Sequence, residues 1–127
     1  MTAEQVTQAM VVNWQDVPGK LSHGGGESHG LLQHIGRADA LHPVLHTLGF
    51  LNRSRIPAGA HHEPHLHDDH EEVFFIVGGK GAVLLGEERR PVHEGDAVYI
   101  PVGTVHGLIN DSDDWLDFVA IGGVAQP

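Results

Sequence analysis

The residues best suited to chemistry lie in one histidine-rich stretch of the chain. His65 and His67 are two residues apart, and Glu72 follows at the start of the apolar run 73–77. In an extended strand, side chains two residues apart point to the same face, so both imidazoles can act at one place. Nitrogen and carboxylate ligands that converge from adjacent strands suit a divalent transition metal. The stretch from Gly59 to Gly79 is therefore a candidate metal site.

A second stretch downstream carries a further histidine next to a corner in the chain. Pro101 cannot donate to a strand ladder and Gly103 permits a turn conformation, so these residues mark a corner and not a central strand. The strand that follows carries His106 and Asn110, which share a face.

Composition limits the classes of function. The 127 residues fit one domain, with a formal charge of −10, only seven Lys and Arg, twelve His and no Cys. Thiolate metal sites and disulfides are excluded, so a metal must be held by His, Asp or Glu. The acidic balance argues against nucleic acid and anionic membrane as partners. With no long apolar run and no signal-like start, we expect a cytoplasmic protein.

The elements that position these residues are predicted to be short strands. Residues 44–56 are β-like, and further strands are expected at 73–77, 82–85, 89–93, 97–100, 105–109 and 115–121. Hairpin connections are predicted at 78–81 and 86–88. Many short strands without a helical stripe predict an all-β antiparallel sandwich or barrel.

The N-terminal third is less regular. We expect a disordered or swapped arm over residues 1–8, a short strand at 10–14 and a weak strand at 29–35. The four glycines within residues 22–30 predict a flexible loop. Residues 1–43 are thus interpreted as an arm with short strands that pack on a barrel formed by residues 44–127, one structural domain overall.

Together the two stretches resemble the motifs of small single-domain cupins. The first motif, G-x5-H-x-H-x(3 or 4)-E-x6-G, is matched at Gly59, His65, His67, Glu72 and Gly79. The second motif, G-x5-P-x-G-x2-H-x3-N, is matched at Gly95, Pro101, Gly103, His106 and Asn110. The resemblance spans residues 44–121 and implies a cupin-type jelly-roll β-barrel (a double-stranded β-helix), often a homodimer. It also implies one metal per chain, held by the positions matching His65, His67, Glu72 and His106.

The donor set agrees with this implication. Three neutral imidazoles and one carboxylate leave a divalent ion with a net charge of +1 and two open octahedral positions. Such a site suits Fe, Mn, Ni, Cu or Zn and is too rich in nitrogen for Ca²⁺ or Mg²⁺. Glu71 is a rival ligand to Glu72, and Glu72 is preferred because it directly precedes the apolar strand.

Three other histidines and the single tyrosine are candidates for a supporting role beside the metal ligands. His61, His62 and His70 are interpreted first as solvated loop residues, with a proton shuttle or a partner of a ligand histidine as the functional alternative. Tyr99 is a candidate proton donor that points into the pocket, or else a core or interface residue. Tyr99 and His70 are therefore the candidate catalytic residues.

The sequence also raises the question of which way two strands face. Arg53 and Arg55 share one face of a strand; they are expected to point outward and to be solvated, and the alternative is that they bind a substrate carboxylate. The continuous apolar run 73–77 predicts a strand buried on both faces, with its outer face against another sheet or a second subunit.

These observations favour a metal-dependent enzyme for a small organic substrate that binds the metal through oxygen atoms. A dioxygenase-type oxidoreductase is the first hypothesis, because three histidines and a glutamate resemble iron dioxygenase sites. The alternative is a redox-neutral isomerase, lyase or cyclase with Zn or Mn, with Tyr99, His46 or His70 as the base. A non-catalytic protein that binds a sugar or a carboxylate is a third hypothesis.

Overall fold

The computed structural model describes residues 9–126 and is built almost entirely of strands. One short 3₁₀ helix, η1 (Trp14–Asp16), precedes them. The strands in chain order are β1 (Lys20–Ser22), β2 (Gly26–His34), β3 (Pro43–Leu45), β4 (Phe50–Ile56), β5 (His70–Gly78), β6 (Lys80–Leu85), β7 (Glu88–His93), β8 (Ala97–Ile100), β9 (His106–Ile109) and β10 (Leu116–Val124). The predicted all-β fold is confirmed.

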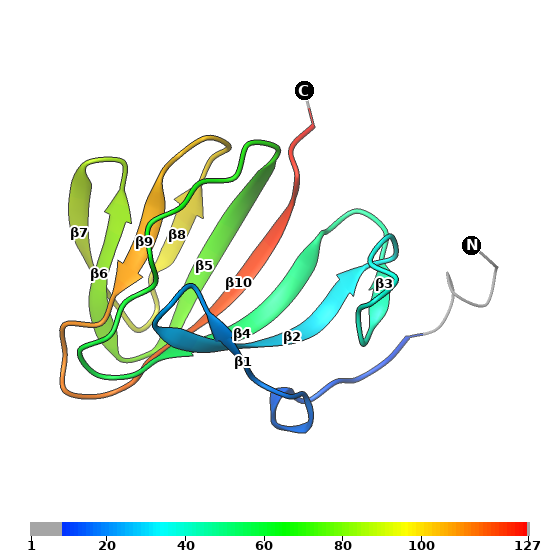
Figure 1. The fold of residues 1–127 in the computed structure, drawn as a ribbon, viewed down its shortest axis with the longest axis horizontal. Coiled ribbons are helices and arrows are strands. Elements are labelled where there is room, and N and C mark those ends of the chain that lie inside the picture. The colour runs from blue at the N-terminus through cyan, green and yellow to red at the C-terminus, as the bar shows by residue number, and fades with distance from the viewer. Residues whose placement is uncertain (1–8, 127) are drawn as a thin grey trace.

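The strands form two sheets (Figure 1). The large sheet has the order β1-β2-β4-β10-β5-β8, with β3 added in parallel beside β2. The small sheet has the order β7-β6-β9. Every pairing except that of β2 with β3 is antiparallel. Because β2 pairs with β4, the N-terminal strands continue the large sheet.

The core fills the space between the two sheets. Its members are apolar side chains that alternate with outward-facing residues along each strand. They include Ile56, Ile76, Ile100, Leu108, Leu116 and Phe118, all essentially inaccessible to solvent. Burying such side chains contributes roughly 1.5–3 kcal/mol each, so this cluster accounts for much of the driving force for folding.

The predicted hairpin at residues 78–81 is wrong, because β5 and β6 belong to different sheets. Gly79 has a φ of +83°, and a Cβ there would lie 2.2 Å from the carbonyl oxygen of Trp115. A glycine is therefore needed where the chain leaves one sheet for the other. The predicted hairpin at 86–88 is confirmed, since β6 pairs with β7 across it.

Two expectations for the N-terminal region also need correction, and a third is untested. Residues 10–14 form no strand, because the Asn13 side chain accepts a hydrogen bond from the Gln15 backbone N–H and caps η1. The expected loop at 22–30 is largely a hairpin between β1 and β2. The arm expected at residues 1–8 lies outside the described residues.

The run 73–77 is buried on one face only. Phe74 and Ile76 lie in the core, whereas Val73 and Phe75 are exposed on the outer surface of the large sheet. The expectation of burial on both faces is therefore wrong for a single chain.

Candidate metal centre

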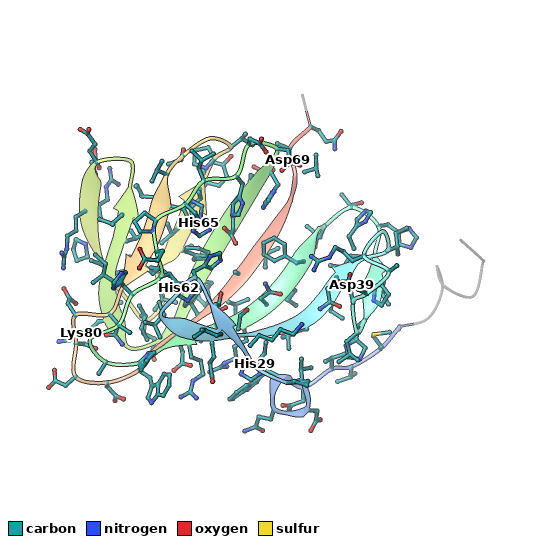
Figure 2. All side chains as sticks on the ribbon, viewed as in Figure 1. His29, Asp39, His62, His65, Asp69 and Lys80 are labelled. Carbon is teal, nitrogen blue, oxygen red and sulfur yellow. The ribbon has the colours of Figure 1, made fainter. Side chains whose placement is uncertain are left out.

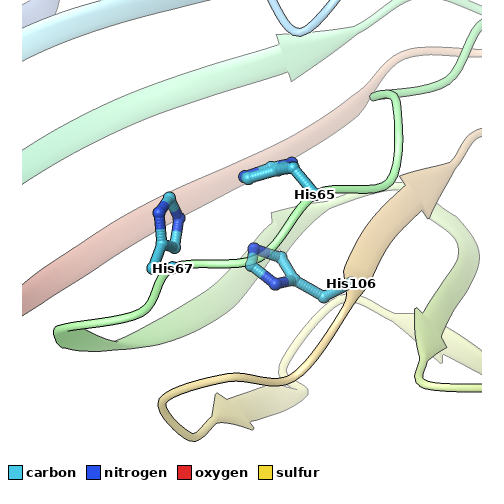
Figure 3. A group of neighbouring side chains, drawn as sticks. All are labelled: His65, His67 and His106. Carbon is cyan, nitrogen blue, oxygen red and sulfur yellow. The ribbon is translucent and has the colours of Figure 1, made fainter.

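Three histidines converge between the two sheets. Each of His65, His67 and His106 offers one ring nitrogen, and these nitrogens all lie within 4.8 Å of one another. Figure 3 shows His65 and His67 on the segment between β4 and β5, with their rings turned toward His106 at the start of β9. The structure thus brings together residues that are 39 and 41 positions apart in the sequence.

Backbone hydrogen bonds fix two of these histidines. His65 and His106 form an antiparallel bridge, in which the N–H of each donates to the carbonyl of the other at 2.9 and 2.8 Å. The Nδ1–H of His65 donates to the Glu63 carbonyl at 3.0 Å, and that of His106 donates to the Thr104 carbonyl at 2.9 Å. With Nδ1 protonated, the Nε2 lone pair of each neutral ring is free to bind a metal.

Glu72 lies beside the three histidines. Its Oε1 atom is 3.5 Å from Nε2 of His67 and 3.4 Å from Nε2 of His106. Glu72 Oε1 and His106 Nε2 are both buried and have no hydrogen-bond partner. Buried polar atoms are almost always paired, because an unpaired one loses its hydration without replacement. A divalent cation between these atoms would satisfy both, so the donor set fits a metal.

The two acidic neighbours on β5 face opposite ways. Glu72 is buried, whereas Glu71 is exposed and accepts a hydrogen bond from the Tyr99 hydroxyl at 2.9 Å. The placement of Tyr99 inside the pocket is wrong, because its side chain is 58% exposed on the outer face of β8. Val98 and Ile100 point inward instead, as strand alternation requires. The hydrogen bond to Glu71 raises the pKa of Tyr99 above its ordinary value.

His70 lies against one member of the cluster. Its ring stacks on His67 with centroids 4.0 Å apart, and its Nδ1 lies 2.8 Å from Oδ1 of Asp69. Burial, followed by the neighbouring His70, lowers the pKa of His67, so His67 is neutral and able to bind a metal near pH 7. His70 therefore contacts a candidate ligand and is not simply a solvated loop residue.

The interpretation of His62 as a solvated loop residue is wrong. Its side chain is only 5% exposed, and its Nε2 atom is buried without a hydrogen-bond partner. Its ring packs edge-on against Phe118 with centroids 5.7 Å apart. Burial, reinforced by His23 and His65, lowers its pKa to about 4. His61 is exposed, as expected, and pairs with Glu63.

Sequence reasoning missed His23 altogether. It lies in the turn between β1 and β2 with a φ of +48°, and its ring stacks on His65 at 4.0 Å with only 12° between the planes. Figure 2 shows the blue β1–β2 turn beside His62, with His65 nearby. Burial and the adjacent His65 lower the pKa of His23. No spacing rule relates residue 23 to the motif, so only the tertiary structure reveals this contact.

The remaining basic candidates lie away from the cluster. Arg53 and Arg55 point outward, as expected, but they are paired and not solvated. They bond to Asp117 Oδ1 at 3.3 and 2.8 Å and lie over the rings of Trp14 and Trp115. His46 is exposed, and its backbone carbonyl accepts a hydrogen bond from Nε2–H of His34 at 3.2 Å.

A small cavity of about 50 Å³ adjoins the histidine cluster, and we call it the inner chamber. His65 and Glu72 form its boundary with the cluster. Its other walls are Ser22, His23, Ser28, Asn52, Ser54, His62, Phe74, Phe118 and Ala120. The inward face of β4 supplies Asn52 and Ser54, while Arg53 and Arg55 point to the opposite face of the same strand. The chamber is thus a polar space directly beside the candidate ligands.

Comparison with known proteins gives a consistent result. Residues 52–122 match the sequence model of the family described as Cupin domain. A relative from Thermotoga maritima, an oxalate-binding protein, is 25% identical over 114 residues, which cover 88% of this chain and 92% of that one. The chain spans about half the length of the uncharacterised curated relatives that it matches at 32–40% identity.

Solved structures agree on the fold. A predicted oxalate decarboxylase from Thermotoga maritima superposes with a TM-score of 0.78 at 22% identity and covers 91% of this chain and 100% of that one. The polyketide cyclase RemF from Streptomyces resistomycificus gives 0.72 at 18% identity, with 94% and 82% covered. Among the described residues, no helix is long and apolar enough to cross a bilayer.

Proposed function

The chain belongs to the cupin domain family, and on that basis we propose that it is a metal-dependent enzyme that acts on a small, oxygen-bearing organic substrate. The proposed ligands of one divalent transition metal are His65, His67, Glu72 and His106. One observation carries the proposal: the buried Glu72 Oε1 and His106 Nε2, 3.4 Å apart, lack any hydrogen-bond partner. A divalent cation bound between the two atoms would satisfy both.

We propose dioxygenase-type oxidation as the first activity to test, because the three histidines and one glutamate form a nitrogen-rich donor set suited to iron. A redox-active ion held by these residues would supply electrons for O₂ activation, and a redox-inert ion would supply Lewis-acid polarisation of a substrate oxygen. His65, His67, Glu72 and His106 would hold the ion, and the inner chamber lies directly beside them.

A redox-neutral reaction is the second candidate, since neutral imidazoles border the chamber. An isomerase, lyase or cyclase needs a base near the substrate. Two of the bases expected from sequence, Tyr99 and His46, are exposed and lie away from the cluster. His62 and His23 line the chamber instead and have lowered pKa values. The polyketide cyclase and the predicted oxalate decarboxylase share this fold.

A non-catalytic role in carboxylate binding is the third candidate. Its support is the 25% identity to the oxalate-binding protein over most of both chains. In that role the substrate would bind to the metal and leave unchanged.

The deciding experiment combines metal analysis with an activity screen. Protein purified without a metal-affinity tag is analysed for bound metals, and O₂ uptake is followed over a set of keto and hydroxy acids. Stoichiometric iron with substrate-dependent O₂ uptake supports the dioxygenase. Zinc or manganese with substrate turnover and no O₂ uptake supports the redox-neutral enzyme. Binding without turnover supports the third candidate, and absence of any tightly bound metal refutes the proposal.

A matched pair of variants links the metal to the proposed ligands. His106→Ala removes a buried ligand and is expected to abolish stoichiometric metal binding. His93→Ala removes an exposed histidine that pairs only with Asp96, and it should leave the metal content unchanged.

A further inference from the structure

We infer that the inner chamber selects ligands whose non-chelating end is uncharged and carries a hydroxyl or carbonyl group, with His62 as a specificity-determining hydrogen-bond partner for that end. The inference rests on the proposed function, because the other end of the ligand is held by the metal. It adds the chemical class of the ligand, which the metal site alone leaves open.

The charges around the chamber exclude a second anionic group. Neither Lys nor Arg is among the residues that line it, and its one acidic side chain is Glu72. Arg53 and Arg55 alternate with the chamber-lining residues of β4, but their side chains point away from the chamber and form ion pairs with Asp117. Once a chelating carboxylate has neutralised the net charge of +1 at the metal site, a second carboxylate or a phosphate in the chamber would lose its hydration without gaining a cation, which is strongly unfavourable.

The polar groups of the chamber suit a neutral partner. Ser54 Oγ lies 3.1 Å from Ser28 Oγ, so the two hydroxyls share one hydrogen bond and the second hydroxyl hydrogen stays free to donate. Asn52 lines the same wall with its side-chain amide. Hydroxyl and amide groups can both donate and accept, so they match hydroxyl and carbonyl groups of a ligand.

His62 is the most constrained of these groups. Its side chain is more than nine-tenths buried, it borders the chamber, and its Nε2 atom has no hydrogen-bond partner among residues 9–126. The ring packs closely against residue 26, which must be glycine because a Cβ there would lie 2.8 Å from Nε2. A buried imidazole without a partner is costly unless a ligand completes it. Its lowered pKa keeps the ring uncharged near pH 7, so it offers a hydrogen bond without a positive charge.

The size of the chamber limits the neutral end. A volume of about 50 Å³ accommodates about three or four groups of the size of a water molecule. A short hydroxymethyl or carbonyl group fits this space, whereas a long chain does not.

Three 2-hydroxy acids that differ only at the third carbon test the inference. Lactate carries a methyl group there, glycerate a hydroxymethyl group and 3-sulfolactate a sulfomethyl group, while the metal-chelating end is the same. Each is titrated calorimetrically into Zn(II)-loaded protein whose metal content has been measured. We expect glycerate to bind about 10-fold more tightly than lactate, as one buried hydrogen bond provides, and the anionic 3-sulfolactate to bind most weakly.

Variants assign the preference to His62. His62→Phe keeps a flat ring but removes both nitrogens, so it should eliminate the advantage of glycerate over lactate and leave the zinc content and lactate affinity unchanged. His62→Gln restores a hydrogen-bonding group and should recover part of the advantage. His61→Phe, at the exposed neighbouring histidine, is the control and should behave like the parent protein.

The outcomes separate the inference from the proposed function. Full zinc loading with equal affinities for lactate and glycerate, or with tightest binding of 3-sulfolactate, would overturn the inference and leave the metal site intact. Failure to bind zinc would refute the proposed function and the inference with it. An advantage for glycerate that persists in His62→Phe would show that His62 is not the specificity-determining residue.

Discussion

Glu72 and His106 face each other across the interior of the barrel, with Glu72 Oε1 3.4 Å from His106 Nε2. They come from different sheets, β5 in the large one and β9 in the small one. Neither atom has a hydrogen-bond partner, although both are buried. The two sequence motifs therefore meet at this pair of atoms, and a cation bound between the atoms would satisfy both.

Glu72→Gln is expected to weaken metal binding by at least about 10-fold, because an amide oxygen is a poorer ligand for a transition metal than a carboxylate. Competition titration against a chelating dye measures the affinity. Glu71→Gln is the matched control, since the adjacent carboxylate is exposed and bonded to Tyr99. Equal affinities in the two variants would show that Glu72 is not a ligand.

Metal removal should lower the thermal stability of the chain. A ligand at 100 times its Kd stabilises the native state by about 2.7 kcal/mol. For a domain of this size that corresponds to a rise in Tm of roughly 10 °C. Differential scanning calorimetry of chelator-treated protein, with and without added zinc, measures the shift. The shift should vanish in His106→Ala, whose circular dichroism spectrum should still show a folded β protein.

The stability of the metal-free chain should decrease with acid partly through His62. Its pKa is about 4 in the folded chain, against 6.5 as the ordinary value. The unfolded state therefore binds the extra proton first, so the stability from this group is complete above pH 6.5 and is lost as pH falls toward 4. The loss amounts to roughly 3 kcal/mol at most.

Urea unfolding from pH 7.5 to 4 tests this linkage by comparing the parent chain with His62→Phe. The groups that act on His62 besides burial are His23, His65, Glu72 and His61, and all are retained in the variant. The difference in unfolding free energy between the two proteins should therefore change with pH in this window. A constant difference would contradict the assignment.

The homodimer implied by the family resemblance stays a prediction. The candidate interface is the outer face of β5 and β10. Val73, Phe75 and Ile121 are exposed on the outer surface of neighbouring strands, where Val73 pairs with Ile121 across β5 and β10. If this face forms the dimer, Phe75→Glu should convert it to a monomer in light scattering, because Phe75 is 45% exposed in the isolated chain. Leu48→Glu, at an exposed apolar residue in the loop between β3 and β4, should leave the dimer intact. A monomeric parent protein would refute the prediction.

Much of the site could be predicted from the sequence because it depends on local order. The spacing of His65, His67 and Glu72 and the corner before His106 are properties of short segments. Strand alternation places Glu72 inward and Glu71 outward, and the structure agrees. The same rule correctly predicted that Arg53 and Arg55 point away from the barrel interior. Their pairing with Asp117 and two tryptophans was not foreseeable, since those partners come from distant parts of the chain.

Only the tertiary structure decided which other groups surround the site. His23 reaches His65 because the β1–β2 turn packs against the segment before β5, where the Glu63 N–H donates to the His23 carbonyl at 2.8 Å. His62 is buried because that same segment pairs with β9 and not with its neighbours in sequence. Burial, orientation and pKa depend on every element packed around a residue. The sequence by itself therefore determined the strands from β4 to β10 and the candidate ligands, and the packing of two sheets determined the chamber beside them.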